Sequence, residues 1–202
     1  MRARLLVLSL LCACGDAFAW GHQGHEVSGA IADELLLDNA SQQVHQILGG
    51  MPLRVAATWA DCAKDVTQSD GGFVYKPDPK FHATCQIFET SEGIARMEDY
   101  VARNWDNCQR QPGDDPCHKA YHYTDVAIQH DHYELGFSGT SDRDVVAAIN
   151  AAIAVLQGQL APAPFSIKDE QEALLMLARH RRQLRERQLP LPSQLKQIAH
   201  AS

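Results

Sequence analysis

One segment near the amino terminus combines residue types that bind a transition metal. Residues 20–25 read Trp-Gly-His-Gln-Gly-His. If processing leaves Trp20 as the first residue, its α-amine, with a pKa of about 8, and its carbonyl oxygen close a chelate on zinc. His25 then offers an imidazole from the same segment. The alternative is a surface tryptophan beside two solvated histidines.

Two further motifs pair a carboxylate with a basic side chain. Asp61 and Lys64 lie three residues apart on one predicted helical face, a spacing usually seen in surface salt bridges. Their apolar neighbours indicate burial, and a buried carboxylate needs a partner such as a metal ion. His122 and Asp125 have the same spacing, and a carboxylate behind a histidine fixes the tautomer for metal binding. The alternative for His122 is a hydrogen-bonded core histidine.

The remaining histidines carry no comparable pattern. His130 and His132 are predicted to point apart on a solvated turn, because they are two residues apart on an irregular loop. No companion pattern accompanies His22, His45, His82, His118 or His200.

Residues 1–19 are predicted to be a signal peptide rather than part of the fold. Arg2 and Arg4 precede an apolar run over residues 5–13, and Ala17-Phe18-Ala19 has the small-x-small form of a cleavage site. A lipoprotein-type signal at residues 11–14 is the alternative. The run is too short for a permanent membrane span, and no other stretch is long and apolar enough. We therefore expect a soluble mature protein that starts at Trp20, in the periplasm or outside the cell.

Composition and cysteine usage agree with a secreted globular domain. The chain has 202 residues, a formal net charge of -7 and 45% hydrophobic residues, which excludes disordered, collagen-like and coiled-coil classes. Removal of the signal peptide, which contains two Arg and one Asp, leaves a mature chain with a net charge of about -8. This negative charge argues against a protein that coats duplex nucleic acid. The four cysteines that remain are Cys62, Cys85, Cys108 and Cys117. Two disulfides are predicted, with three possible pairings, and the long spacings disfavour a zinc site made of these cysteines.

Hydrophobic periodicity predicts helices joined by loops. No sustained alternation of apolar and polar residues predicts a strand, so the expected fold class is all-α, in one domain. Residues 69–80 and 111–115 are predicted loops. Predicted helix-capping residues are Ser41, Ser91, Asp142 and Ser166, with Asp169 at a capping-box position. The predicted helices cover residues 25–38, 41–48, 54–64, 91–105, 145–157 and 167–187.

The three motifs, in this order, resemble the S1/P1 nuclease family over about residues 20–180. These are single-strand-specific nucleases with three zinc ions, related to zinc-dependent phospholipase C. The resemblance implies an all-α fold with a zinc cluster at one end. It also implies hydrolysis of phosphodiester bonds in RNA and single-stranded DNA, which leaves 5′ phosphates.

The resemblance also implies a role for each motif residue. Trp20 and His25 would bind one zinc. Asp61, His122 and His180, which lies in the last predicted helix, would bind a second zinc. The catalytic residues implied are Asp61 itself with Lys64 and Asp125, which match positions that act around the reacting phosphate.

The sequence departs from the family pattern after His180. Leu184 stands where the family has a bridging aspartate, and Pro190 stands where it has a histidine of the third zinc. Six of the eighteen Lys and Arg residues fall between residues 179 and 196, so we interpret residues 181–202 as a divergent basic tail of a truncated or frameshifted reading frame. At most two partial zinc sites would remain, and we expect impaired activity.

Two other functions fit parts of the sequence. A phospholipase C-like phosphodiesterase shares the implied fold, but no exposed apolar stripe for lipid is predicted. A non-catalytic, disulfide-bonded helical binding domain would have no need of zinc at Trp20. No membrane or protein partner is inferred, and the expected partner is single-stranded DNA or RNA as substrate.

Overall fold

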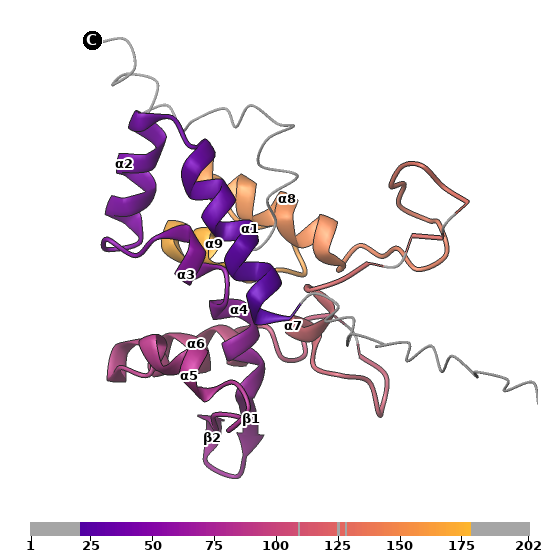
Figure 1. The fold of residues 1–202 in the computed structure, drawn as a ribbon. Helices are drawn as coiled ribbons and strands as arrows, with labels where there is room; N and C mark the ends of the chain where they lie inside the picture. Colours follow the sequence, from indigo (N-terminus) through magenta and orange to yellow (C-terminus); the bar gives the residue numbers. More distant parts are fainter. Residues whose placement is uncertain (1–20, 109, 125, 128, 179–202) are drawn as a thin grey trace, which may run out of the picture.

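The computed structural model describes residues 21–178 except 109, 125 and 128, so Trp20, Asp125 and His180 lie outside the described residues. The described chain is mostly helical, with one small antiparallel hairpin (Figure 1). In chain order the helices are α1 (His22–Leu35), α2 (Asp38–Ile47), α3 (Leu53–Ala56), α4 (Trp59–Cys62), α5 (His82–Cys85), α6 (Ser91–Arg103), α7 (Cys117–Ala120), α8 (Val145–Leu156) and α9 (Glu170–Leu177). Two short 3-10 helices, η1 (Ala63–Asp65) and η2 (Gln86–Phe88), follow α4 and α5.

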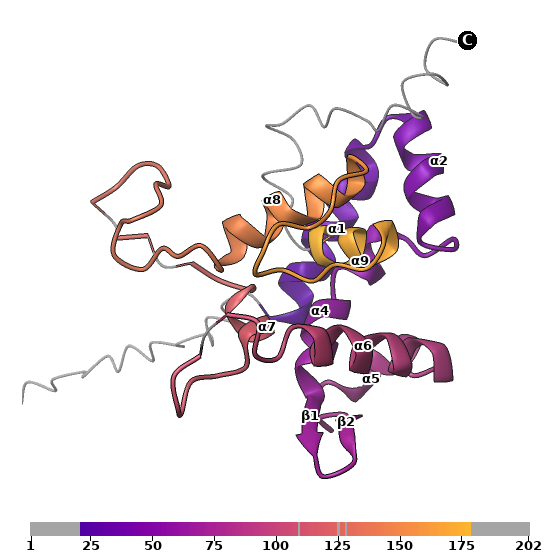
Figure 2. The same ribbon diagram turned by 180° about the vertical axis from the view of Figure 1, so that it is seen from behind.

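The hairpin corrects the strand-free, all-α prediction. β1 (Val66–Ser69) pairs antiparallel with β2 (Gly72–Tyr75), so the predicted loop over residues 69–80 contains a strand. Both strands have only four residues, and a single buried side chain in each leaves no alternation for the sequence to display. Seen from behind, the hairpin projects below α4 and α6, away from α1, α8 and α9 (Figure 2).

Close contact between α1 and α3 fixes the position of the amino-terminal helix. Gly29 makes this contact possible, because a Cβ there would lie 2.7 Å from the Cα of Arg54. The Asp33 carboxylate accepts hydrogen bonds from the backbone N–H groups of Leu53 (2.9 Å) and Arg54 (3.0 Å). These amides open α3 and have no partner within the helix, so α1 caps α3 with a side chain.

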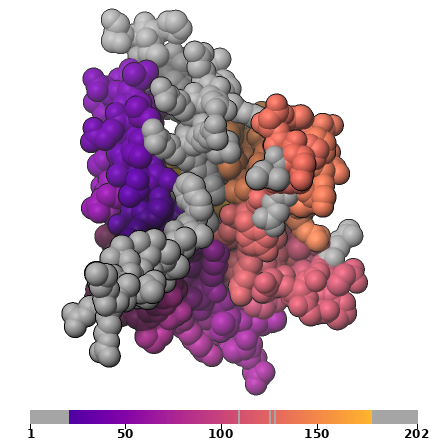
Figure 3. Space-filling model, turned by 45° about the vertical axis from the view of Figure 1, so that its right-hand side comes forward, coloured from indigo at the N-terminus to yellow at the C-terminus, as the bar shows by residue number. Residues whose placement is uncertain are grey.

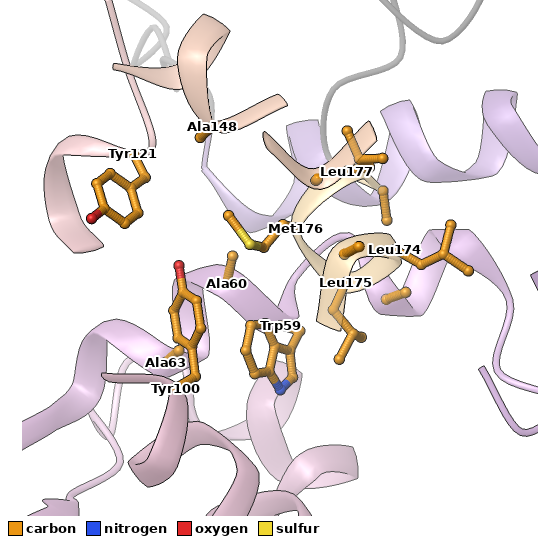
Figure 4. Close-up of a cluster of buried hydrophobic side chains, with 14 of the residues drawn as sticks. Trp59, Ala60, Ala63, Tyr100, Tyr121, Ala148, Leu174, Leu175, Met176 and Leu177 are labelled. Carbon is orange, nitrogen blue, oxygen red and sulfur yellow. The ribbon is translucent and has the colours of Figure 1, made fainter. Parts of the chain in front are cut away.

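The hydrophobic core lies where α4, α6, α8 and α9 meet. Trp59 is 1% exposed, and its ring lies 5.1 Å from that of Tyr100. Met176 of α9 extends toward Ala60 of α4, and Leu175 lies beside Trp59 (Figure 4). The residue that follows this buried face of α4 is Asp61, so the core sets the orientation of that carboxylate.

An ion pair inside the protein joins α6 to α9. Glu172 is fully buried, and its carboxylate accepts from Arg103 Nη2 (2.6 Å) and from the Lys168 backbone N–H (2.6 Å). Burial raises the pKa of Glu172 above its usual range, although Arg103 and the Lys168 amide favour the charged form. A carboxylate in this environment needs its partners to remain in place.

Several predicted helix starts and caps are wrong by a few residues. α1 and α2 each begin three residues earlier than predicted, and α2 has Leu37 rather than Ser41 as its N-cap. Thr90 rather than Ser91 caps α6, and Asp144 rather than Asp142 caps α8. Asp169 is itself the N-cap of α9, so Ser166 does not open that helix. At α6 and α8 a neighbouring polar residue takes the cap, whereas α2 begins without a side-chain cap.

The remaining predicted helix divides, and both disulfides form. The region predicted as one helix over residues 54–64 consists of α3, α4 and η1. Of the three possible pairings, the structure shows Cys62–Cys85 and Cys108–Cys117. Within the described residues, no helix has both the length and the apolar character needed to cross a membrane.

Candidate metal centre

Three of the sequence-predicted ligands converge in the structure. His25 Nε2 lies 3.1 Å from Asp61 Oδ2, and His122 Nδ1 lies 3.7 Å from Asp61 Oδ1. The exposed fractions of these side chains are only 7% for His25, 9% for Asp61 and 4% for His122. The Asp61 carboxylate therefore stands between two imidazoles that come from distant parts of the sequence.

The predicted contact between Asp61 and Lys64 is also present. Lys64 Nζ lies 2.7 Å from Asp61 Oδ1, and the Lys64 side chain is 35% exposed. The pair is thus half-buried, not the freely solvated salt bridge that the spacing alone favours. Lys64 is the most exposed of these four side chains.

Each member of the cluster is positioned by a different contact of the fold. His25 lies in the first turn of α1, one turn before Gly29, which packs against α3. Asp61 belongs to α4 and lies between the buried residues Ala60 and Cys62. His122 follows α7 and lines a small cavity with Tyr100, Tyr121, Ala148 and Met176, among others.

The space-filling view shows segments from distant parts of the chain on one face of the molecule (Figure 3). In Figure 3 the violet α1 and α2 occupy one flank, and the orange-red segment around residues 130–140 occupies the other. The magenta α6 and the hairpin lie below them. The face that carries the amino-terminal helix therefore combines segments from the beginning and the middle of the chain.

The donor set of the cluster fits zinc. Zinc takes imidazole nitrogen and carboxylate oxygen as ligands, commonly with three protein ligands at a catalytic site. His25, Asp61 and His122 are of these two types, and their donor atoms already face one another. Three further predicted site residues, Trp20, Asp125 and His180, lie outside the described residues.

Sequence reasoning missed His22 as a neighbour of this cluster. Its ring stacks on Phe81 with centroids 4.4 Å apart. Burial lowers the pKa of His22, and the charges of Asp61, His25 and Lys64 also act on it. The only signal in the sequence is its place within the segment of residues 20–25, because its contact partner Phe81 lies far along the chain.

A second grouping of potential ligands includes the same histidine. A nitrogen of His22 and the sulfurs of Cys62 and Cys85 lie within 4.8 Å of one another. However, the two sulfurs are bonded to each other in a disulfide. Zinc binds the thiolate form of cysteine, so this grouping does not fit a metal while the disulfide is intact.

The other histidines lie away from the cluster. His130 and His132 are exposed, as predicted, but they do not simply point apart, because both rings approach Phe137, at 3.8 Å and 5.5 Å between centroids. His118 is fully buried and stacks on Trp105 at 5.8 Å. Burial lowers the pKa of His118 to about 4, so this ring is neutral near pH 7.

Comparison with known proteins supports the resemblance seen in the sequence. Neither a curated protein nor a solved structure matches the chain. The family model described as S1/P1 Nuclease matches residues 20–180, the span that begins at Trp20 and ends at His180. That span is most of the chain and includes every residue of the cluster, so the protein belongs to the S1/P1 nuclease family.

Proposed function

We propose that the protein is a secreted, zinc-dependent endonuclease that hydrolyses single-stranded DNA and RNA to products with 5′ phosphates. The convergence of His25, Asp61 and His122 is the observation that carries this proposal. Family membership supports the nuclease activity, and the disulfides are compatible with secretion. Zinc at such a site activates water and offsets the negative charge that develops on the phosphate.

Within this proposal each residue has a defined task. His25 would hold one zinc, and Asp61 and His122 would hold a second zinc beside it. Trp20 would add its amine and carbonyl oxygen beside His25. We assign His180 as a further ligand of the Asp61 zinc by its match to the family motif.

Two side chains would act on the substrate. Lys64 orients the Asp61 carboxylate and keeps a partly exposed ammonium at the edge of the cluster. In that position it is able to contact a phosphate oxygen. We assign Asp125 a role at the reacting phosphate by its match to the family motif.

We further propose that the activity of this chain is reduced. A carboxylate shared between metals and the ligands of a third zinc are part of the family pattern, but this chain has Leu184 and Pro190 at two of those positions. Hydrolysis by several metals requires charge stabilisation on both the attacking and the leaving oxygen. With these two ligands replaced, we expect slow turnover on both DNA and RNA.

The test compares zinc content and cleavage in matched variants of the chain that starts at Trp20. Asp61→Asn preserves the shape of the side chain but removes its charge, so it should lose zinc and any cleavage of a labelled single-stranded oligonucleotide. Asp70→Asn, in the exposed hairpin turn, should match the unaltered protein. Equal zinc stoichiometry in Asp61→Asn and the unaltered chain, by elemental analysis, would refute the proposed centre.

A second variant tests the terminal ligand. One extra residue before Trp20 places an amide where the free amine would be, so one zinc should be lost. For the unaltered terminus, zinc binding should strengthen as pH rises through the amine pKa of about 8, because only the neutral amine binds metal. A terminus that binds zinc equally well with the extra residue would exclude Trp20 as a ligand.

A further inference from the structure

The first turn of α1 needs support from outside the helix. Its N-cap is Gly21, which offers no side-chain oxygen, and the first turn contains no acidic residue. The opening N–H groups of a helix have no partner within it, so a turn without a side-chain cap frays readily. His25 belongs to this turn, and fraying would move it away from Asp61.

An aromatic contact holds that turn at its first residue. His22 opens α1, and its imidazole stacks on Phe81 with centroids 4.4 Å apart and planes inclined by 26°. The Nε2 atom of His22 is buried and has no hydrogen-bond partner among the described residues, so this nitrogen does not help to hold the ring. Lys80 Nζ lies 5.1 Å from the centre of the Phe81 ring and adds a cation–π contact.

Phe81 is in turn tied to the helix that carries Asp61. It is the N-cap of α5, which ends at Cys85, and Cys85 is bonded to Cys62, the residue after Asp61. The loop before Phe81 is anchored at the same place. The backbone carbonyl of Asp65, in η1, accepts a hydrogen bond from the Lys76 N–H (3.0 Å), and the Asp65 carboxylate accepts one from the Asp78 N–H (3.0 Å).

These contacts form a closed circuit around the candidate metal centre. From Asp61 the chain passes to Cys62, across the disulfide to Cys85, and back to Phe81. The ring contact then leads to His22, and one turn of α1 leads to His25, whose Nε2 lies 3.1 Å from Asp61. Every step is a covalent bond, a helical turn or a direct contact.

We propose that the His22–Phe81 stack is a positioning clamp, which holds the amino-terminal metal-binding segment against Asp61. This inference rests on the proposed function, because it assigns His25 and Trp20 to the metal centre. Neither His22 nor Phe81 binds the metal itself. The segment between α4 and α6, which carries Phe81, thereby contributes to metal affinity without supplying a ligand.

The experiment measures zinc affinity by competition with a chromophoric chelator, and amide hydrogen exchange of the metal-free protein. Phe81→Leu keeps an apolar side chain but removes the ring face, whereas Phe81→Tyr keeps the ring. We expect Phe81→Leu to weaken zinc binding about tenfold, equivalent to about 1.4 kcal/mol, and to speed exchange over residues 22–29. Phe81→Tyr should keep the zinc affinity and the exchange rate of the unaltered chain. Phe73→Leu removes a hairpin ring that contacts Trp105, and it should leave zinc affinity and hydrogen exchange unchanged.

Substitutions at His22 separate stacking from metal binding. His22→Phe retains a flat ring without nitrogen and should bind zinc as the unaltered chain does, whereas His22→Leu should resemble Phe81→Leu. If His22→Phe and His22→Leu lose zinc equally, the imidazole itself binds metal and the clamp is overturned. These variants also decide the matter if Phe81→Leu does not fold.

The two readouts distinguish failure of the clamp from failure of the proposed function. Unaltered zinc affinity and exchange in Phe81→Leu would overturn the clamp and leave the metal centre standing. If the unaltered chain binds no zinc, the proposed centre fails. Exchange in the metal-free protein then still decides whether the stack fixes the first turn of α1.

Discussion

The buried His118 side chain should make the stability of this protein sensitive to mild acid. It is fully buried in α7, its ring stacks on Trp105, and neither ring nitrogen has a hydrogen-bond partner among the described residues. Burial lowers its pKa from 6.5 to about 4, and the positive charges of Lys119 and Lys64 act in the same direction. Nearby Asp115 opposes them, and Arg110 adds to them more weakly.

The sign and size of the effect follow from proton linkage. In the unfolded chain this histidine takes up a proton as pH falls through 6.5, whereas in the folded protein it remains neutral until about pH 4. The unfolded state therefore binds more protons between these values, and stability falls as pH is lowered through this window. The difference between the two pKa values lowers the free energy of unfolding by about 3 kcal/mol at pH 4. Above about pH 7.5 His118 is neutral in both states and adds no pH dependence.

The assay is urea-induced unfolding of the metal-free, disulfide-intact protein at a series of pH values from 4 to 8. His118→Phe keeps a ring against Trp105, and His118→Leu removes the ring, but neither takes up a proton. Both should flatten the pH dependence by about 3 kcal/mol relative to the unaltered chain, whatever their stability at pH 8. An unaltered protein whose pH dependence equals that of both variants would refute the reasoning.

Three other predictions follow from the packing. Gly29→Ala places a Cβ against the α3 backbone and should cost about 1–3 kcal/mol in urea unfolding and weaken zinc binding, whereas Gly71→Ala, with open space, should do neither. Arg103→Met should lower the free energy of unfolding by about 3–5 kcal/mol, because it leaves Glu172 buried without its cation. Glu172→Gln should lower it less in the same urea titration, and the reverse order would contradict this account. Thiol alkylation without reductant should add no mass to the chain that starts at Trp20, and four added groups would exclude both disulfides.

Much of the candidate site was predictable because its ligands come from short motifs. His25, Asp61, Lys64 and His122 were each identified by residue type and local spacing, and the structure brings these four side chains together. The side chains that bind zinc are those of His, Cys, Asp and Glu, so few residues qualify as candidates. α8 was predicted almost to the residue, since a run of apolar residues ends at Gly158, which has a positive φ of 76°.

The parts that were not predicted depend on contacts between distant segments. His22 gains significance only through Phe81, and nothing near either residue in the sequence indicates the other. The disulfide pairing has the same character, because four cysteines allow three arrangements until the fold is known. The hairpin is short and mostly exposed, so its strands carry almost no hydrophobic pattern.

The net charge of the described chain bears on how the proposed metal centre would attract a phosphate. Residues 21–178 contain 23 Asp and Glu against 10 Lys and Arg, so this part of the chain repels a polyanion such as a nucleic acid. At the cluster itself, Lys64 is already paired with Asp61. Bound zinc would then be the main source of positive charge for a phosphate as well as the source of the chemistry. If the proposed centre binds zinc, the contacts that fix its ligands, among them Gly29 against α3 and the ring of Phe81, would govern substrate binding and hydrolysis together.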